Sequence, residues 1–187
     1  MNAQNRQTGT ALVTSLLLLL VLTVIGISAM QVTRVQERMA GNTRDLNLSF
    51  QGAEAALRNG EDMIAAQAFP PDPCSTAPCD FWAPGASAVA NSETRSWSSW
   101  WLTNTTPYEA NGDHAHPTTE MTDLNADPRF VVEFVAEISD PLTTGEAGNR
   151  SSRYFYQVTA ASPGAATSAA TAAPTAMTVL QSTYARR

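Results

Sequence analysis

The residue types best suited to bind a metal begin with two histidines in the second half of the chain. Asp113, His114 and His116 lie within GDHAHP, and one carboxylate beside two imidazoles offers three ligands to a transition metal. A short loop of this kind, bounded by Pro117, is more often a solvated surface than a ligand set. We therefore predict no bound metal, with His114 and His116 as the candidate ligands if one binds.

A second stretch matches the start of a calcium-binding loop. Asp123 and Asp127 flank Asn125 in a D-x-N-x-D pattern, which is how an EF-hand loop begins. The EF-hand also needs Gly at its sixth position and Glu at its twelfth, where this chain has Pro128 and Phe134. The pattern is incomplete, so calcium binding is the less favoured interpretation.

No motif for catalysis stands out in the sequence. It contains no nucleophile motif, no phosphate-binding loop and no paired carboxylates in a specific context. The net charge is −6, and all 11 basic residues are Arg. An acidic chain without a basic cluster binds nucleic acid poorly, because that affinity comes from many cationic contacts. We expect a protein without enzymatic activity, cofactor or nucleic-acid partner.

Two cysteines, Cys74 and Cys79, lie in a segment rich in Pro, Ser and Thr. Two thiolates without a nearby His or Cys leave a zinc site half empty, and a redox motif has two rather than four intervening residues. A local disulfide is favoured if the segment is exported, with two free thiols as the alternative. Closing so small a ring contributes about 2 kcal/mol in the loop-closure model.

Tryptophans gather just after this segment, at Trp97, Trp100 and Trp101, with Trp82 before them. Exposed aromatic side chains could form a platform for a sugar or a docking patch for a protein. Large aromatic residues more often belong to the core. We favour the core and keep Trp97, Trp100 and Trp101 as candidate surface-binding residues.

An uninterrupted apolar segment at residues 11–30 is a candidate membrane-spanning helix, and the candidate residues above all lie after it. It contains no charged residue, and at 1.5 Å per residue it makes about 30 Å of helix, the hydrocarbon thickness of a bilayer. A buried core helix is the alternative, but the rest of the chain is too small to cover it on every face. Arg6 precedes the run and places that end in the cytoplasm. A secretory signal peptide would share these features.

The helix pattern continues well beyond the apolar segment, which argues against a cleaved signal peptide. Residues 31–66 contain no Pro, and apolar residues recur at spacings of three, four and seven. The predicted helix covers residues 10–66 and ends before Pro70 and Pro71. We expect its apolar stripe from Leu46 to Ile64 to pack on a sheet; the stripe comprises Leu46, Phe50, Ala53, Leu57 and Ile64.

Strand patterns occupy the last third of the chain. Residues 129–138 alternate two faces, one of them carrying Phe130, Val132, Phe134, Ala136 and Ile138. Residues 153–161 and 175–184 are two further strands, and a fourth is expected near residues 97–102. The low-complexity loop at residues 162–174 is expected to be mobile. The fold class is α+β, with a long N-terminal helix packed on a small antiparallel sheet.

The N-terminal arrangement resembles that of type IV prepilins. They have a short polar leader ending in Gly, then an apolar run that flows directly into an amphipathic helix. Two stretches, QERMAGN at residues 36–42 and SFQGAEAAL at residues 49–57, are similar to those of PilX-type minor pilins. The last residues, VLQSTYARR at 179–187, resemble the end of the same group.

The resemblance implies processing of the N-terminus. A prepilin peptidase would cut between Gly9 and Thr10 and leave Thr10 to be N-methylated, although Phe or Met is commoner there. Major pilins carry Glu at the fifth mature position, where this chain has Thr14. The absence of that carboxylate favours a minor subunit. The domains implied are a leader (1–9), a transmembrane half-helix (10–30), an amphipathic half-helix (31–68) and a β-rich head (69–187).

The resemblance also implies a function. It is that of a minor pilin in the initiation or tip complex of a type IV pilus, supporting adhesion and twitching motility. The implied partners are other minor pilins, the major pilin, the inner-membrane assembly platform and the prepilin peptidase, with a tip adhesin as a further one. The implied location is the inner membrane of a Gram-negative bacterium, with the head in the periplasm, and then the pilus. The alternatives are a type II secretion pseudopilin and a tip adhesin.

Overall fold

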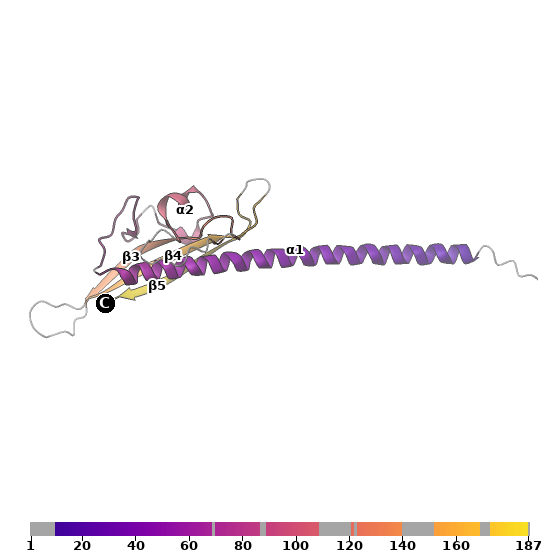
Figure 1. Ribbon diagram of the computed structural model, residues 1–187, viewed down its shortest axis with the longest axis horizontal. Coiled ribbons are helices and arrows are strands. Elements are labelled where there is room, and N and C mark those ends of the chain that lie inside the picture. Colours follow the sequence, from indigo (N-terminus) through magenta and orange to yellow (C-terminus); the bar gives the residue numbers. More distant parts are fainter. Residues whose placement is uncertain are drawn as a thin grey trace, which may run out of the picture. The chain divides into compact units, whose positions relative to one another are not determined.

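The computed structural model describes residues 10–68, 70–86, 89–108, 121, 123–139, 152–168 and 173–186. The elements in chain order are α1 (Thr10–Ala66), β1 (Phe81–Trp82), the 3-10 turn η1 (Ser92–Thr94), α2 (Ser99–Asn104), β2 (Thr106–Pro107), β3 (Arg129–Ser139), β4 (Ser152–Pro163) and β5 (Met177–Arg186) (Figure 1). The chain forms two units, residues 1–43 and 44–187, so the boundary falls within α1.

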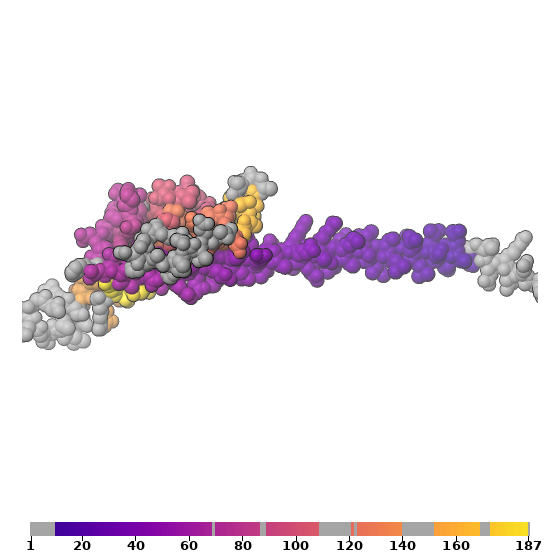
Figure 2. Space-filling view, in the orientation of Figure 1, coloured from indigo at the N-terminus to yellow at the C-terminus, as the bar shows by residue number. Residues whose placement is uncertain are grey.

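The first unit contains the apolar part of α1, and the bounds of α1 match the helix predicted from the sequence. Among the described residues, α1 is the one helix long and apolar enough to cross a membrane; its most apolar stretch has a mean hydropathy of 2.6, and none of that stretch is buried. Figure 2 shows its side chains (indigo) uncovered on the visible face. The first unit therefore has an apolar surface that its own residues do not cover.

The second unit is built on a sheet with the strand order β1–β3–β4–β5, and β2 pairs separately with β3. The β3–β4 and β4–β5 pairs are antiparallel, which confirms the three predicted strands; β3 and β4 are slightly longer than predicted, and β5 begins and ends two residues later than predicted. The two-residue strand β1 runs parallel to β3. The sheet is therefore mixed at one edge, where only antiparallel pairing was predicted.

Strand β3 departs from the simple alternation predicted for it. Phe130, Val131 and Val132 are all buried, because α1 covers one face of the sheet and the segment containing Trp82 and Val89 covers the other. The register shifts between Phe134 and Ala136, as at a β-bulge. Beyond the shift the strand leaves the core, and Ile138 is 55% exposed. The prediction that Phe130, Val132, Phe134, Ala136 and Ile138 share one face therefore holds as far as Phe134, which packs against the core, and fails at Ile138.

The head-facing side of α1 consists mostly of small and polar residues, with the larger Met63 and Ile64 near its C-terminal end. Gly52, Ala53, Ala56 and Gly60 are buried against the sheet. A Cβ atom on Gly60 would lie 2.6 Å from Val158 Cγ1, so only glycine allows the helix this close.

The predicted packing stripe of α1 was therefore partly wrong. Ala53 and Ile64 are fully buried, as expected, but Leu46 and Phe50 are 53% and 48% exposed. The stripe was drawn through the largest apolar residues. Small residues face the sheet because the backbone of α1 lies close to it. Helical spacing alone does not show where the sheet lies, so it could not show which residues face it.

Residues 97–102 do not form the strand that was predicted. Instead, α2 begins at Ser99 and ends at Asn104. Trp101 lies parallel to Trp97, four residues earlier and just before α2, at 6.3 Å between ring centroids, and edge-on to its neighbour Trp100 at 5.0 Å. Aromatic residues commonly favour strands, but here the three rings pack together around a short helix.

Candidate functional site

The polar side chains of the apolar segment are satisfied within their own helix. Thr14 Oγ1 donates to the carbonyl of Ala11 at 3.0 Å, and Ser28 Oγ donates to the carbonyl of Val24 at 2.9 Å. Ser15 and Thr23 make the same kind of bond. Hydroxyl groups bonded in this way need no water, which suits a helix in an apolar environment. Thr14 is neutral and its donor is engaged, so it cannot supply the charge that a carboxylate would.

A buried carboxylate fixes the first turns of α1 within the head. Asp45 is only 7% exposed. Its Oδ1 accepts the backbone N–H groups of Ala165 and Ala166 at 2.6 and 2.9 Å, and its Oδ2 accepts the hydroxyl of Thr175 at 3.1 Å. Hydrogen bonds accepted by a carboxylate are charge-assisted and strong, and Asp45 accepts three of them. Asp45 thereby ties α1 to the described parts of the connection between β4 and β5.

Further polar contacts run along the side of α1 that faces β5. Ser49 and Thr178 share a hydrogen bond of 2.5 Å between their hydroxyl oxygens. About three turns later the hydroxyl of Ser182 donates to Glu61 Oε1 at 2.6 Å. On another side of the helix, Asn59 Nδ2 donates to the carbonyl of Tyr108 at 2.5 Å. These contacts fix the register of the helix on the sheet.

The last strand closes the C-terminal end of α1. Arg186 Nη1 donates to the carbonyl of Ile64 at 2.7 Å, and Nη2 donates to the carbonyl of Gln67. The last carbonyls of a helix have no partner within it and carry partial negative charge, so a guanidinium is a favourable cap.

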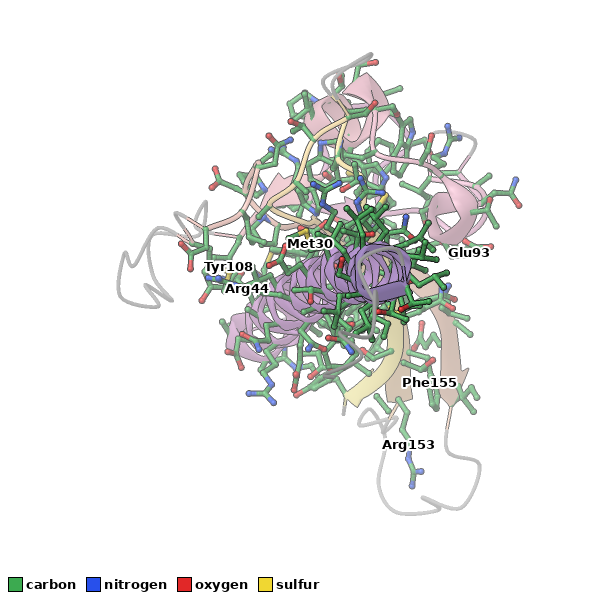
Figure 3. All side chains as sticks on the ribbon, turned by 90° about the vertical axis from the view of Figure 1, so that its right-hand side faces the viewer. Met30, Arg44, Glu93, Tyr108, Arg153 and Phe155 are labelled. Carbon is green, nitrogen blue, oxygen red and sulfur yellow. A yellow bond between two sulfur atoms is a disulfide. The ribbon has the colours of Figure 1, made fainter. Side chains whose placement is uncertain are left out.

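We predict that Arg186→Met lowers the free energy of unfolding by about 2 kcal/mol, because two charge-assisted hydrogen bonds are lost, one to the Ile64 carbonyl in α1 and one to the Gln67 carbonyl just after it. Chemical denaturation of the full chain in detergent micelles measures this. The matched control is Arg153→Met, since Arg153 is exposed and extends away from the strands in Figure 3. Equal stability of the two variants would contradict the capping role.

The tryptophan cluster is divided between core and surface. Trp101 is fully buried and Trp82 is 1% exposed, whereas Trp97 and Trp100 are half-buried. The guanidinium of Arg95 lies 4.4 Å from the ring centroid of Trp100, a cation–π contact. Burial excludes Trp101 as a surface-binding residue. Trp97 and Trp100 are each partly exposed, and Trp100 also packs against the cluster of Trp82, Val89 and Val131.

A second arginine, Arg129 at the start of β3, bonds to the end of the helix that carries Trp100 and Trp101. Arg129 Nε donates to the hydroxyl of Thr105 at 2.9 Å, and Nη2 donates to the carbonyls of Thr105 and Leu102 at 2.6 and 3.2 Å. Burial lowers the pKa of Arg129, and the nearby charge of Asp127 acts in the opposite direction. These bonds attach the C-terminal end of α2 to the first residue of β3.

Cys74 and Cys79 form a disulfide, as the sequence analysis favoured. The backbone of Cys74 also pairs with β1, through its N–H to the carbonyl of Phe81 at 2.9 Å and its carbonyl to the N–H of Ala83 at 2.8 Å. The bridge thus stabilises a loop that is attached to the edge of the sheet.

The metal candidates are not assembled into a site by the described residues. His114 and His116 lie outside those residues, as does Gly9. Asp123 and Asp127 are exposed, and within the described part of the chain no three His, Cys, Asp or Glu side chains are grouped closely enough to hold an ion. No described feature favours a metal over the polar loop interpretation.

Comparison with protein families accounts for nearly the whole chain. A model described as PilX N-terminal matches residues 8–58, and one described as type IV pilus assembly protein PilX C-term matches residues 52–186. The comparisons with curated proteins and with solved structures gave no match. The apolar helix and the α+β head agree with a structural component that is anchored in a membrane and associated with a pilus. The chain therefore belongs to the PilX family of type IV pilus assembly proteins.

Proposed function

We propose that this protein is a minor pilin that acts in the initiation or tip complex of a type IV pilus. Its role is structural, and no catalysis is expected. The observation that carries the proposal is the uncovered apolar half of α1, joined in one continuous helix to a packed head in a chain of the PilX family. Such a helix can anchor the subunit in the membrane and later pack against other subunits.

The residue at position 14 supports a minor rather than a major role. The resemblance to pilins associates a carboxylate at this position with the terminal amine of a neighbouring subunit. Thr14 is neutral and donates its hydroxyl to Ala11 of its own helix. A subunit without this ion pair is better suited to the end of a fibre than to its repeating shaft.

Processing and location follow from the same proposal. The prepilin peptidase would cleave between Gly9 and Thr10, and Thr10 would be N-methylated. The head would lie in the periplasm of a Gram-negative cell before assembly and on the pilus afterwards. A disulfide in the head is consistent with an oxidising compartment. The partners would be other minor pilins, the major pilin and the inner-membrane assembly platform.

The test is an in-frame deletion in the native host, complemented with the wild-type gene. We expect at least a tenfold loss of surface pili and the loss of twitching, both restored by complementation. Pili at the wild-type number in the deletion strain would contradict the proposal. A loss of protein export with normal pili would instead favour the type II secretion pseudopilin.

A tip adhesin is the second candidate, and the half-buried Trp97 and Trp100 favour it specifically, together with Leu102, which is 56% exposed. Exposed indole rings can stack on sugar faces or fill a protein pocket. Binding of the full chain to a glycan array should disappear with Trp100→Ala and persist with Val135→Ala, an exposed aliphatic control. No binding by the wild-type chain would count against this candidate.

A further inference from the structure

The outer edge of β5 is the most unusual surface of the head. Strand β5 is the last strand in the order β1–β3–β4–β5, so among the described residues it pairs only with β4. Along residues 178–185, TVLQSTYA, it carries no charge and no Pro. Proteins usually blunt a free edge with charged side chains, Pro, bulges or a short strand, because its unpaired N–H and C=O groups invite another strand. Strand β5 has 10 residues, and its pairing with β4 shows no bulge.

Exposed apolar side chains of α1 lie on the same side of the head as this edge. Leu46 precedes Ile64 by five full turns of helix, and Phe50 precedes Glu61 by three. The Glu61 side chain bonds to Ser182 of β5, and Leu46 and Ile64 point between the directions of Glu61 and Ser49, whose side chain bonds to Thr178 of β5. Leu46 and Phe50 therefore point toward the β5 side of α1, yet they are 53% and 48% exposed.

Figure 3, which looks along α1, shows that this side is distinct from the one that Tyr108 occupies. Tyr108 accepts its hydrogen bond from Asn59, which points away from Leu46 by more than a third of a turn. Among the residues that the structure describes, the unpaired edge of β5 and the exposed Leu46 and Phe50 thus form one surface, which we call the β5 edge surface; it consists of Leu46, Phe50 and residues 178–185.

We infer that the β5 edge surface receives an extended, uncharged segment of a different pilus component. That segment adds to the sheet as a further strand and packs alternate apolar side chains on Leu46 and Phe50. Main-chain hydrogen bonds to the edge would supply affinity, and the side chains that contact the helix would supply specificity. The inference rests on the proposed role in pilus assembly, because that role supplies the class of partner.

A second copy of the chain fits this surface less well. Strand β5 runs in the same direction as α1 within the head, since Ser49 meets Thr178 and Ile64 meets Arg186. Two copies joined symmetrically by antiparallel β5 edges would have their Arg44 residues at opposite ends of the shared sheet. Both chains are expected to enter their heads from the same membrane, so this arrangement would separate the two entry points by a strand length.

Site-specific photocross-linking in the native host tests the inference. A benzoylphenylalanine is placed at Thr183 or at Phe50 of the full chain, each expressed in the deletion strain. We expect both positions to give an adduct with one and the same pilus component other than this chain. The cross-linked peptide should be an uncharged segment with alternating apolar residues.

A charge at the edge should prevent this contact. Thr183→Lys is expected to lower the yield of the adduct from position 50 at least tenfold, because a lysine at a strand edge opposes strand addition. Val135→Lys is the matched control, since Val135 is 45% exposed on the inner strand β3 and should leave the yield within twofold.

Three results would overturn the inference: no adduct at either position, an adduct between two copies of the chain, or a yield that Thr183→Lys does not change. Surface pilus counts in the same strains report on the proposed function separately. Normal piliation in the deletion strain would contradict the proposed function. If the deletion strain lacks pili but the Thr183→Lys variant restores them fully, only the inference about the β5 edge surface would be contradicted.

Discussion

Replacing Gly60 by valine should lower the free energy of unfolding of the head by about 3 kcal/mol. A Cβ atom at this position would lie 2.6 Å from Val158 Cγ1 and 3.0 Å from Phe130 Cδ2. Both neighbours are fully buried and belong to β3 and β4, so neither can move without disturbing the sheet. The helix would have to lift away from the strands, and the apolar contacts around Ile64 and Met63 would loosen with it.

The control for this prediction is Gly41→Val. A Cβ atom on Gly41 meets nothing within 4 Å, although it is in the same helix. Denaturation of each full-length variant in detergent micelles, followed by the near-ultraviolet signal of the tryptophans, separates the two effects. Gly41→Val should unfold at the wild-type denaturant concentration. A Gly60→Val variant as stable as Gly41→Val would show that the helix does not approach the sheet as closely as described.

Replacing Asp45 by alanine should cost about 3 kcal/mol, because it leaves the N–H groups of Ala165 and Ala166 without their acceptor. Both groups lie beside Gly164, where a Cβ atom would meet the Asp45 carboxylate at 2.4 to 2.6 Å. The carboxylate thus fills a space that the backbone leaves for it. Alanine would leave that space empty as well as the donors unpaired.

Asp45→Asn is the matched variant, since an amide oxygen can still accept from these N–H groups without a charge. It should lose about half as much stability as alanine. Hydrogen exchange at the amides of Ala165 and Ala166 should accelerate strongly in the alanine variant and modestly in the asparagine variant. Exchange at the wild-type rate in Asp45→Ala would contradict the role of Asp45 in holding this connection.

The long helix was predictable because its signals are local. An apolar segment without charges, a continued helical period and the prolines after residue 68 determine where α1 begins and ends, and Thr10–Ala66 agrees with that prediction. The three long strands were predictable for the same reason, since alternation and β-branched residues mark each of them. In each case neighbouring residues carry the information.

The side of α1 that packs on the sheet was not predictable in this way. Leu46 and Phe50 have the hydrophobicity expected of core residues, whereas Gly52 and Gly60 do not. The structure reverses their roles, because close approach of helix and sheet favours residues without bulk. The position of the sheet determines which face of α1 is buried, and helical spacing carries no information about that position.

The charged residues that stabilise the head were missed for a related reason. Asp45 and Arg186 look like ordinary surface charges in the sequence, and their partners lie 120 and 122 positions away, at Ala165 and Ile64. No local motif links such pairs. In the sequence, Asp45 follows Arg44 and looks like any other charged residue on a helix surface. Its neighbours do not distinguish it from Glu54, which forms an exposed ion pair with Arg58.

The secondary structure of the tryptophan segment, residues 97–102, was not predictable from the strand preference of its residues. Residues 97–102 were expected to form a strand, but Trp100 and Trp101 lie in α2, and the ring of Trp101 contacts those of Trp97 and Trp100. The prediction that most of these aromatics belong to the core was nearer to the structure than the prediction of their secondary structure. Burial follows from side-chain size, whereas backbone conformation here follows from contacts within the cluster.

The most direct test of the central claim is the N-terminal residue and mass of the protein isolated from the membranes of its host. We expect a chain that begins at Thr10 with a methylated amino group, which is the product of prepilin processing. A chain that begins near Met30, or that retains Met1, would contradict it and would leave a released or simply anchored binding protein in place of a pilus subunit.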